Sequence, residues 1–232
     1  MSQQQVVLFL DRTDAGLQLA RKLRAYAGRT DTVVLGLPRG GVPVAAEVAA
    51  QLRAPLDIFL VRKLGVPMHE ELAMGAIASG GVRVLNEDVI ANLQIPLALI
   101  DRVAAREQQE LERRERLYRG GRPAPDLTDL TVIVVDDGLA TGASMSAAVA
   151  GLRMQSPAHI VVAVPTAAPE TCELFKDQVD EIVCAETPQP FLGVGFWYKN
   201  FAQTTDDEVR RLLAEARQIP YAPRSATVCK TP

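Results

Sequence analysis

The chain has 232 residues, of which 48% are hydrophobic and 23% are charged, and its formal net charge is −3. This length is enough for one large domain or for a domain with an appendage, and the composition is ordinary for a globular protein. The small negative charge excludes a global basic field that would recruit nucleic acid or an anionic membrane, so we expect neither partner, and an anionic ligand needs a local site.

The cysteines and histidines are too few for a zinc site at any recognised spacing. Cys172, Cys184 and Cys229 are odd in number and form no CxxC pair, so we expect reduced thiols in a cytoplasmic protein. The first residues, MSQQQVVLFLDRTDAG, lack the basic start and long apolar run of a signal peptide. No apolar stretch reaches the ~18 residues of a membrane span.

The first part of the chain predicts a strand–loop–helix–strand unit, which is typical of a parallel sheet. Thr13 or Asp14 can cap a first helix that runs to about Tyr26. A Pro-Arg-Gly-Gly turn then follows an apolar run. The elements expected in this unit are strands at 32–37 and 55–63 and a helix at 42–52.

Residues 64–122 depart from the strand–loop–helix–strand pattern of the first part and are expected to form an insertion. AMGAIASGGVRVL predicts two short strands around a Ser-Gly-Gly turn. A long helix is expected from Pro96 to Arg119, with a narrow apolar stripe flanked by many Arg and Glu residues. Such a helix is typical of a solvated, projecting element, although it could support a homodimer together with the hairpin. The stripe consists of Leu97, Ala104, Leu111 and Tyr118.

After a turn-rich loop, the alternation of strands and helices resumes. A cluster of aromatic residues, PFLGVGFWYKNF, follows the last expected strand. A final helix is expected to start near Asp206, and residues 221–232 are expected to be a loose tail. The elements expected here are strands at 131–136, 159–166 and 179–186 and helices at 142–154 and 168–176.

The stretch VIVVDDGLATGAS, residues 132–144, carries the strongest functional signal. A buried strand runs into Asp136 and Asp137, and a loop of small residues then opens a helix. Ligands of parallel sheets lie at the carboxyl ends of the strands, and the first helical turn offers free N–H groups to an anion. The loop is therefore predicted to bind a monophosphate. Its residues are Ala140, Thr141, Gly142, Ala143 and Ser144.

The two aspartates would repel a phosphate unless they bind another part of the ligand. Neutral hydroxyls, or a divalent metal shared with the ligand, are suitable targets, and a sugar phosphate meets both demands. The stretch lacks the Gly-Lys-[Ser/Thr] ending of a P-loop, and the chain contains no GxGxxG fingerprint.

VIVVDDGLATGAS resembles the phosphoribosyl-pyrophosphate (PRPP) motif of type I phosphoribosyltransferases. The resemblance implies that Asp136 and Asp137 hold the ribose hydroxyls and that residues 140–144 hold the 5′-phosphate. It also implies an α/β fold with a parallel sheet flanked by helices. The implied cofactor is Mg²⁺, bound by Asp136 and Asp137 directly or through the ligand or water. Ala140 replaces the acid that 6-oxopurine enzymes have in this loop, so the acceptor base stays open.

Two further stretches fit the same family. LGLPRGGVPVA resembles its pyrophosphate loop, in which a strained or cis peptide is common, and implies that Arg39, Gly40 and Gly41 bind pyrophosphate. FLVRKLGVPMHEE resembles the start of the flexible loop that closes over PRPP. Arg39, Arg62 and Lys63 are then the expected stabilisers of the leaving group. If a general base is needed, the candidates in that loop are His69, Glu70 and Glu71.

The family also places a small hood over the sheet, which stacks on the acceptor base. Here the hood is expected over about residues 186–204, together with the N-terminal segment, within a single domain of residues 1–220. Phe196 and Trp197 either line the acceptor site or fill the hood itself, and Asp11 and Arg12 could also face the pocket.

The function that the sequence favours is transfer of the 5-phosphoribosyl group from PRPP to a small nitrogenous base. The alternative is a regulator of the same fold that senses PRPP or a nucleotide without turnover. No separate nucleic-acid-binding segment is evident, which disfavours that alternative. A hydrolase of sugar phosphates is poorly supported because the sequence offers no nucleophile–base pair.

Overall fold

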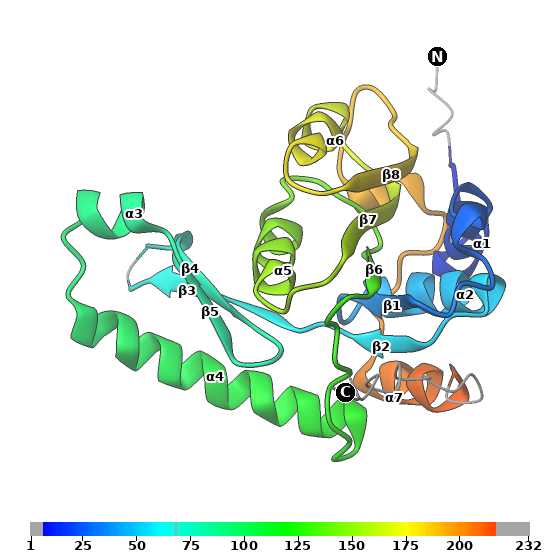
Figure 1. The fold of residues 1–232 in the computed structure, drawn as a ribbon. Helices are drawn as coiled ribbons and strands as arrows, with labels where there is room; N and C mark the ends of the chain where they lie inside the picture. Colours follow the sequence, from blue (N-terminus) through cyan, green and yellow to red (C-terminus); the bar gives the residue numbers. More distant parts are fainter. Residues whose placement is uncertain (1–6, 68, 217–232) are drawn as a thin grey trace, which may run out of the picture.

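The centre of the molecule is a parallel sheet of five strands in the order β2-β1-β6-β7-β8 (Figure 1). This computed structural model describes residues 7–67 and 69–216, without the side chains of residues 69–71. β1 and β6 are buried along their whole length, as expected for strands covered on both faces. In sheet order the strands are Leu56–Ile58, Thr32–Gly36, Thr131–Val135, His159–Thr166 and Glu181–Glu186.

Helices cover both faces of this sheet, and alternate residues of each strand face opposite helices. Val34 and Ile133 pack with α1 (Arg12–Lys22) and α2 (Gly41–Leu52). Their neighbours in the strands pack instead against α5 (Ala143–Arg153) and α6 (Pro169–Lys176). The predicted parallel α/β architecture is therefore confirmed.

Two expected boundaries were wrong. The side chain of Asp11 caps α1 by accepting a hydrogen bond from the amide of Asp14, so neither Thr13 nor Asp14 is the cap. The strand expected at 55–63 is two strands, because β2 ends at Ile58 and β3 begins at Val61. Leu60 leaves the central sheet there, since its amide donates to Ser79 Oγ and its carbonyl accepts from the Ser79 amide, each at 2.9 Å.

The expected insertion contains a separate antiparallel sheet of three strands, in the order β3-β4-β5. These strands are Val61–Val66, His69–Ala78 and Val82–Leu85, followed by the helices α3 (Glu87–Asn92) and α4 (Leu97–Arg119). The predicted hairpin is thus confirmed, and β3 extends it by one strand.

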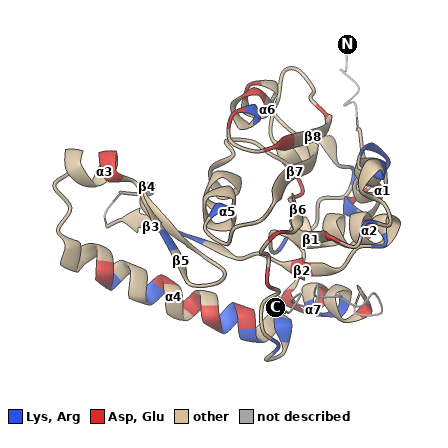
Figure 2. Cartoon of the chain, in the orientation of Figure 1, with Lys and Arg blue, Asp and Glu red and all other residues tan. Residues whose placement is uncertain are grey.

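The long helix α4 is solvated on one face only. Figure 2 shows acidic and basic residues interspersed along it, as the sequence predicts. Its other face is buried, with Ala104, Leu111 and Tyr118 packed in a cluster shared with β3, β4 and α7 (Asp206–Glu215). Leu97, which the sequence placed in the same stripe, is 69% exposed. The helix is therefore a packed element rather than a freely projecting one.

The aromatic segment after β8 pairs with the first described residues of the chain. The amides of Leu8 and Phe9 donate to the carbonyl of Trp197, at 3.0 and 3.1 Å, and the amide of Lys199 donates to the carbonyl of Phe9. A short 3₁₀ helix, Val194–Trp197, leads into this pairing. Among the described helices, none is both long and apolar enough to cross a membrane.

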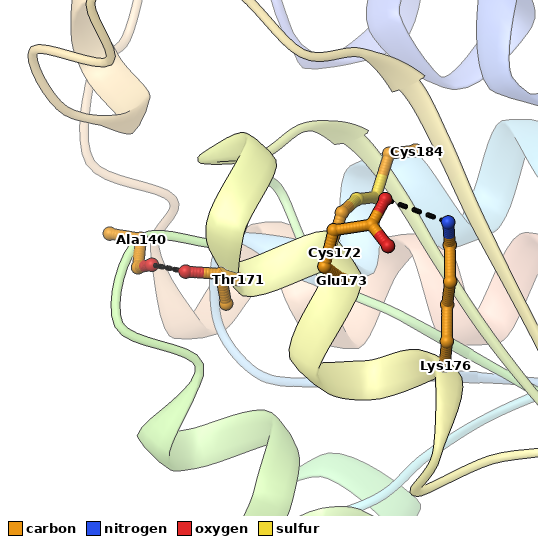
Figure 3. The surroundings of a disulfide bond; sticks show 6 residues. All are labelled: Ala140, Thr171, Cys172, Glu173, Lys176 and Cys184. Carbon is orange, nitrogen blue, oxygen red and sulfur yellow. Dashed lines mark hydrogen bonds and ion pairs between the residues drawn. A yellow bond between two sulfur atoms is a disulfide. The ribbon is translucent and has the colours of Figure 1, made fainter.

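Cys172 of α6 and Cys184 of β8 form a disulfide (Figure 3). The expectation of reduced thiols was therefore wrong for these two residues, while Cys229 lies outside the described residues. The bond was not foreseeable from spacing alone. It arises because α6 packs on β8 and brings the two Cα atoms to 6.9 Å.

We expect the disulfide to stabilise the fold by about 3 kcal/mol, the chain-entropy value for a closed loop of roughly this length. A dithiol reductant should lower the thermal midpoint of the parent protein. The same reductant should leave the midpoint of a Cys172→Ala/Cys184→Ala variant unchanged. Equal shifts in both proteins would show that the reductant acts elsewhere.

Candidate functional site

Two loops from different parts of the sequence meet at the carboxyl edge of the central sheet. β1 and β6 are paired in parallel with Gly36 opposite Val135, so the chain leaves both strands at the same edge. The amide of Leu37 then donates to the carbonyl of Val135 at 2.9 Å. The segment 37–41 consequently lies against Asp136 and Asp137.

This contact requires glycine at two positions. A Cβ on Gly40 would lie 2.0 Å from Asp137 Oδ2, and one on Gly41 would lie 2.6 Å from the carbonyl oxygen of Val135. Neither neighbour can move away cheaply, because one is a packed carboxylate and the other is backbone. The peptide bond between Pro38 and Arg39 is cis, as the resemblance to the pyrophosphate loop led us to expect.

The two carboxylates are held in a poorly solvated environment. Burial raises the pKa of Asp136 well above its usual range, and the adjacent Asp137 raises it further. Burial also raises the pKa of Asp137, although the Arg12 guanidinium opposes that rise. Asp136 Oδ1 accepts a hydrogen bond from the amide of Asp137 at 2.9 Å, so the acid pair is also fixed by its own backbone.

Arg12, at the start of α1, is the cation that balances this pair. Its Nε and Nη2 atoms lie 2.9 and 2.8 Å from Asp137 Oδ2. Its Nη1 donates to the carbonyl of Ala202 at 2.7 Å, and its guanidinium lies 3.9 Å from the ring centroid of Phe201. Arg12 therefore links the acid pair to the aromatic segment, a role that a lone arginine at a helix start does not reveal in the sequence.

Tyr198 is a site residue that sequence reasoning missed. Its hydroxyl donates to the backbone carbonyl of Asp137 at 2.6 Å. Its ring packs against Phe9 and Phe201, with centroid distances of 5.2 and 4.9 Å. Burial, followed by the charge of Asp137, raises the pKa of the Tyr198 hydroxyl far above its ordinary value. Tyr198 is thus a hydrogen-bond donor that stays protonated.

The small-residue loop, 140–144, is supported from behind by α6. Thr171 Oγ1 donates to the carbonyl of Ala140 at 2.6 Å (Figure 3). Gly142 precedes α5 with φ of 75°, and a Cβ there would lie 2.7 Å from the Phe175 ring. The first amides of α5 have no partners within the helix, so the loop can present them to an anion.

Arg62, Lys63 and Ser144 line one cavity of 500 Å³ between β3, α4 and the start of α5. This brings residues from two of the three motifs together. Arg62 is paired with Glu107 of α4, whereas Lys63 is exposed. Arg39 lies in the third motif, and its Nη1 is 3.7 Å from Asp206 Oδ1 at the start of α7.

The two aromatic candidates differ in accessibility. Phe196 is 38% exposed, while Trp197 is 7% exposed. Their rings meet edge to face at 5.4 Å. The indole N–H of Trp197 is buried without a hydrogen-bond partner in the described structure. Phe196 is therefore the side chain of the two that a ligand can reach. The side chains of His69, Glu70 and Glu71 lie outside the described part.

The acid pair cannot enclose a metal ion without help. Within the described residues, no group of three or more His, Cys, Asp or Glu side chains is placed to hold one. Asp136 and Asp137 nevertheless suit a divalent cation, because both are desolvated carboxylates whose charge a cation would offset. Such an ion would need oxygen ligands from a bound anion or from water.

The fold agrees with the comparisons to known proteins. The profile of the phosphoribosyl transferase domain matches residues 11–65 and 68–196, so the chain belongs to that family, and its fold is that of the type I enzymes. It is 48% identical over 211 residues to a Mycobacterium tuberculosis H37Rv protein named "Putative phosphoribosyl transferase Rv0571c". That match covers 91% of this chain and 47% of the relative, so the chain spans about half of the relative's length.

A solved structure is also similar along most of its length. The crystal structure of TT1426 from Thermus thermophilus has a TM-score of 0.80 and 43% sequence identity to this chain. The match covers 89% of this chain and 98% of the other. The overall fold is therefore shared with at least one protein solved by crystallography.

The raised pKa of Asp136 predicts a pH-dependent cost to stability. A carboxyl whose pKa is raised on folding binds its proton more tightly in the native state, so stability falls as pH rises from about 3.9, the unfolded value, through the raised native value. Asp136→Asn removes this cost. It should raise the thermal midpoint at pH 8 relative to the parent, by about 2–4 °C for each kcal/mol regained.

The comparison should be repeated at pH 4, close to the unfolded pKa of about 3.9, where the native carboxyl is protonated, most of the cost is absent and the advantage should shrink. Thermal melts of the two proteins across this pH range measure the effect. A variant that is less stable than the parent at pH 8 would contradict the assignment of Asp136 as a desolvated carboxylate whose burial costs stability.

Proposed function

We propose that the chain transfers the 5-phosphoribosyl group of PRPP to a nitrogenous base and releases pyrophosphate. The observation that carries the proposal is the contact between the Gly40–Gly41 backbone and the Asp136–Asp137 carboxylates. It brings the turn of residues 39–41 and the acid pair that precedes the loop 140–144 to one edge of the sheet, which supports binding of a sugar that carries phosphates at both ends.

Each part of the donor has a proposed partner. The loop 140–144 binds the 5′-phosphate through the first amides of α5 and the hydroxyls of Thr141 and Ser144. Asp136 and Asp137 accept hydrogen bonds from the ribose hydroxyls. The turn of Arg39, Gly40 and Gly41 binds the pyrophosphate. Arg12 offsets the charge of Asp137, so the carboxylates repel the incoming anion less.

The proposed reaction requires few protein groups that take part directly in making or breaking bonds. The bond between ribose C1 and the pyrophosphate oxygen breaks, its electron pair leaves with the pyrophosphate, and the acceptor nitrogen bonds to C1. The proposed task of Arg39, Arg62 and Lys63 is to stabilise the negative charge on the leaving group. Holding donor and acceptor in line can contribute about 7–11 kcal/mol to lowering the barrier.

Mg²⁺ is the proposed cofactor, and when bound it would neutralise part of the pyrophosphate charge. Asp136 and Asp137 would hold it directly, through the ligand or through water. For the acceptor, we propose a base stacked on Phe196, the exposed member of the aromatic pair. Quenching of Trp197 fluorescence by a bound base would report such stacking, since the two rings are in contact. His69, Glu70 and Glu71 remain the candidates for a general base.

The proposal is tested by thermal melts with PRPP and Mg²⁺, followed by a pyrophosphate-release screen over purines, pyrimidines and simple amines. At ~100 times its dissociation constant, PRPP should stabilise the protein by about 2.7 kcal/mol. Asp136→Asn and Asp137→Asn should fold and lose most of this gain. No shift at millimolar PRPP would contradict the proposal. Binding without turnover of any base would favour the alternative, a PRPP-sensing regulator.

A second experiment separates the two anion sites. Ser144→Ala should weaken binding of ribose 5-phosphate and PRPP alike, because both carry the 5′-phosphate. Arg39→Ala should weaken PRPP and pyrophosphate and spare ribose 5-phosphate. Losses of about 1.5–3 kcal/mol are expected for a hydrogen bond to a charged group, measured by calorimetric titration. Identical ligand profiles for the two variants would refute the assignment of two distinct loops.

A further inference from the structure

The insertion helix α4 places one carboxylate where an apolar side chain would be expected. Glu107 lies on the buried side of the helix, between Ala104 and Leu111, and its side chain is 8% exposed. Carboxylates are almost never buried to this degree unless they are paired. The buried Glu107 carboxylate therefore needs an oppositely charged partner, and the structure shows one.

That partner is Arg62 of β3. Glu107 Oε2 accepts from Arg62 Nε at 2.8 Å and from Arg62 Nη2 at 2.5 Å. The second carboxylate oxygen, Oε1, accepts from Arg106 Nε at 3.2 Å, but the Arg106 side chain is 80% exposed and can move away. Glu107 is thus held mainly by Arg62, and Arg62 is in turn fixed along one edge of its guanidinium.

Within the part of the chain that the structure describes, the other edge of the Arg62 guanidinium has no hydrogen-bond partner and is available to a ligand. A guanidinium has five N–H donors, and the contact with Glu107 uses only the Nε and Nη2 side. Arg62 lines the 500 Å³ cavity whose other wall includes Ser144 of the phosphate loop. Moving Arg62 off Glu107 would leave a buried charge without its principal partner, which is costly. Arg62 should therefore stay on Glu107 when an anion enters the cavity.

We propose that Glu107 is a positioning residue, which holds Arg62 oriented toward the cavity so that its free N–H groups bind the pyrophosphate end of PRPP. The inference rests on the proposed function and extends it, because it makes the insertion a contributor to the donor site through α4. Lys63, which is exposed on the same strand, has no comparable anchor among the described side chains and would act as a mobile point charge.

The test uses Glu107→Gln with Glu110→Gln as its matched control. Glu110 lies on the same helix and also pairs with two arginines, Arg113 and Arg114, but none of these three lines the cavity. Calorimetric titrations with Mg²⁺-pyrophosphate and with ribose 5-phosphate are the readout. Glu107→Gln should weaken pyrophosphate binding about tenfold, within the range of coupling between contacting charged groups, and leave ribose 5-phosphate unchanged. Glu110→Gln should change neither.

A double-mutant cycle then asks whether Glu107 acts through Arg62. Arg62→Met should weaken pyrophosphate binding, and adding Glu107→Gln to it should have no further effect. Arg62→Lys keeps the charge at the cavity but cannot make the two-donor contact, so it should lose nearly as much affinity as Arg62→Met. This variant keeps a cation beside Glu107 and provides the test even if Glu107→Gln fails to fold.

The outcomes separate the inference from the function on which it rests. If the parent binds pyrophosphate and PRPP but Glu107→Gln does so equally well, the proposed function stands and the positioning role is wrong. The role is also overturned if Glu107→Gln weakens ribose 5-phosphate as much as pyrophosphate, or if Arg62→Lys binds like the parent. A parent protein that binds neither PRPP nor pyrophosphate would remove the proposed function itself.

Discussion

The close approach of the Gly40–Gly41 backbone to Asp136 and Asp137 is the constraint on which the site depends. Two chain segments can approach this closely only where no Cβ intervenes, and the resulting contact buries the carboxylates and raises their pKa values. The cost of that burial is limited by Arg12, which in turn fixes the start of α1 against the aromatic segment. The glycine turn, the ion pair of Arg12 with Asp137 and the aromatic segment are therefore connected through direct contacts.

Most of the fold could be predicted because its signals are local. The buried runs at β1, β6 and β7 are rich in β-branched residues, and the acid pair follows β6 without interruption. The break between β2 and β3 could not be predicted, because the apolar run from Ile58 to Val61 is continuous. The break coincides with the hydrogen bond from the Leu60 amide to Ser79, a residue distant in the sequence. Likewise, no local pattern pairs Arg12 with Asp137, Tyr198 with the Asp137 carbonyl, or Cys172 with Cys184.

Three arginines near the site share a feature that the sequence does not reveal, since each is paired with a carboxylate on another part of the chain. Arg12 pairs with Asp137, Arg39 with Asp206 and Arg62 with Glu107. Arg12 and Arg62 make contacts below 3 Å with partners whose side chains are at most 16% exposed. Arg39 lies 3.7 Å from a half-exposed partner. Arg12 and Arg62 are thus held more firmly by their partners than Arg39 is.

The pairing of β1 with β6 also bears on how the protein forms. Val34 lies opposite Ile133, and the whole insertion of β3, β4, β5, α3 and α4 intervenes in the chain between them. During synthesis the glycine turn emerges long before the acid pair, so the nascent chain carries half of the site with nothing to complete it. Such distant parallel pairing is slow to form. The insertion, whose strands pair only with near neighbours, can fold first and shorten the loop that β6 must close.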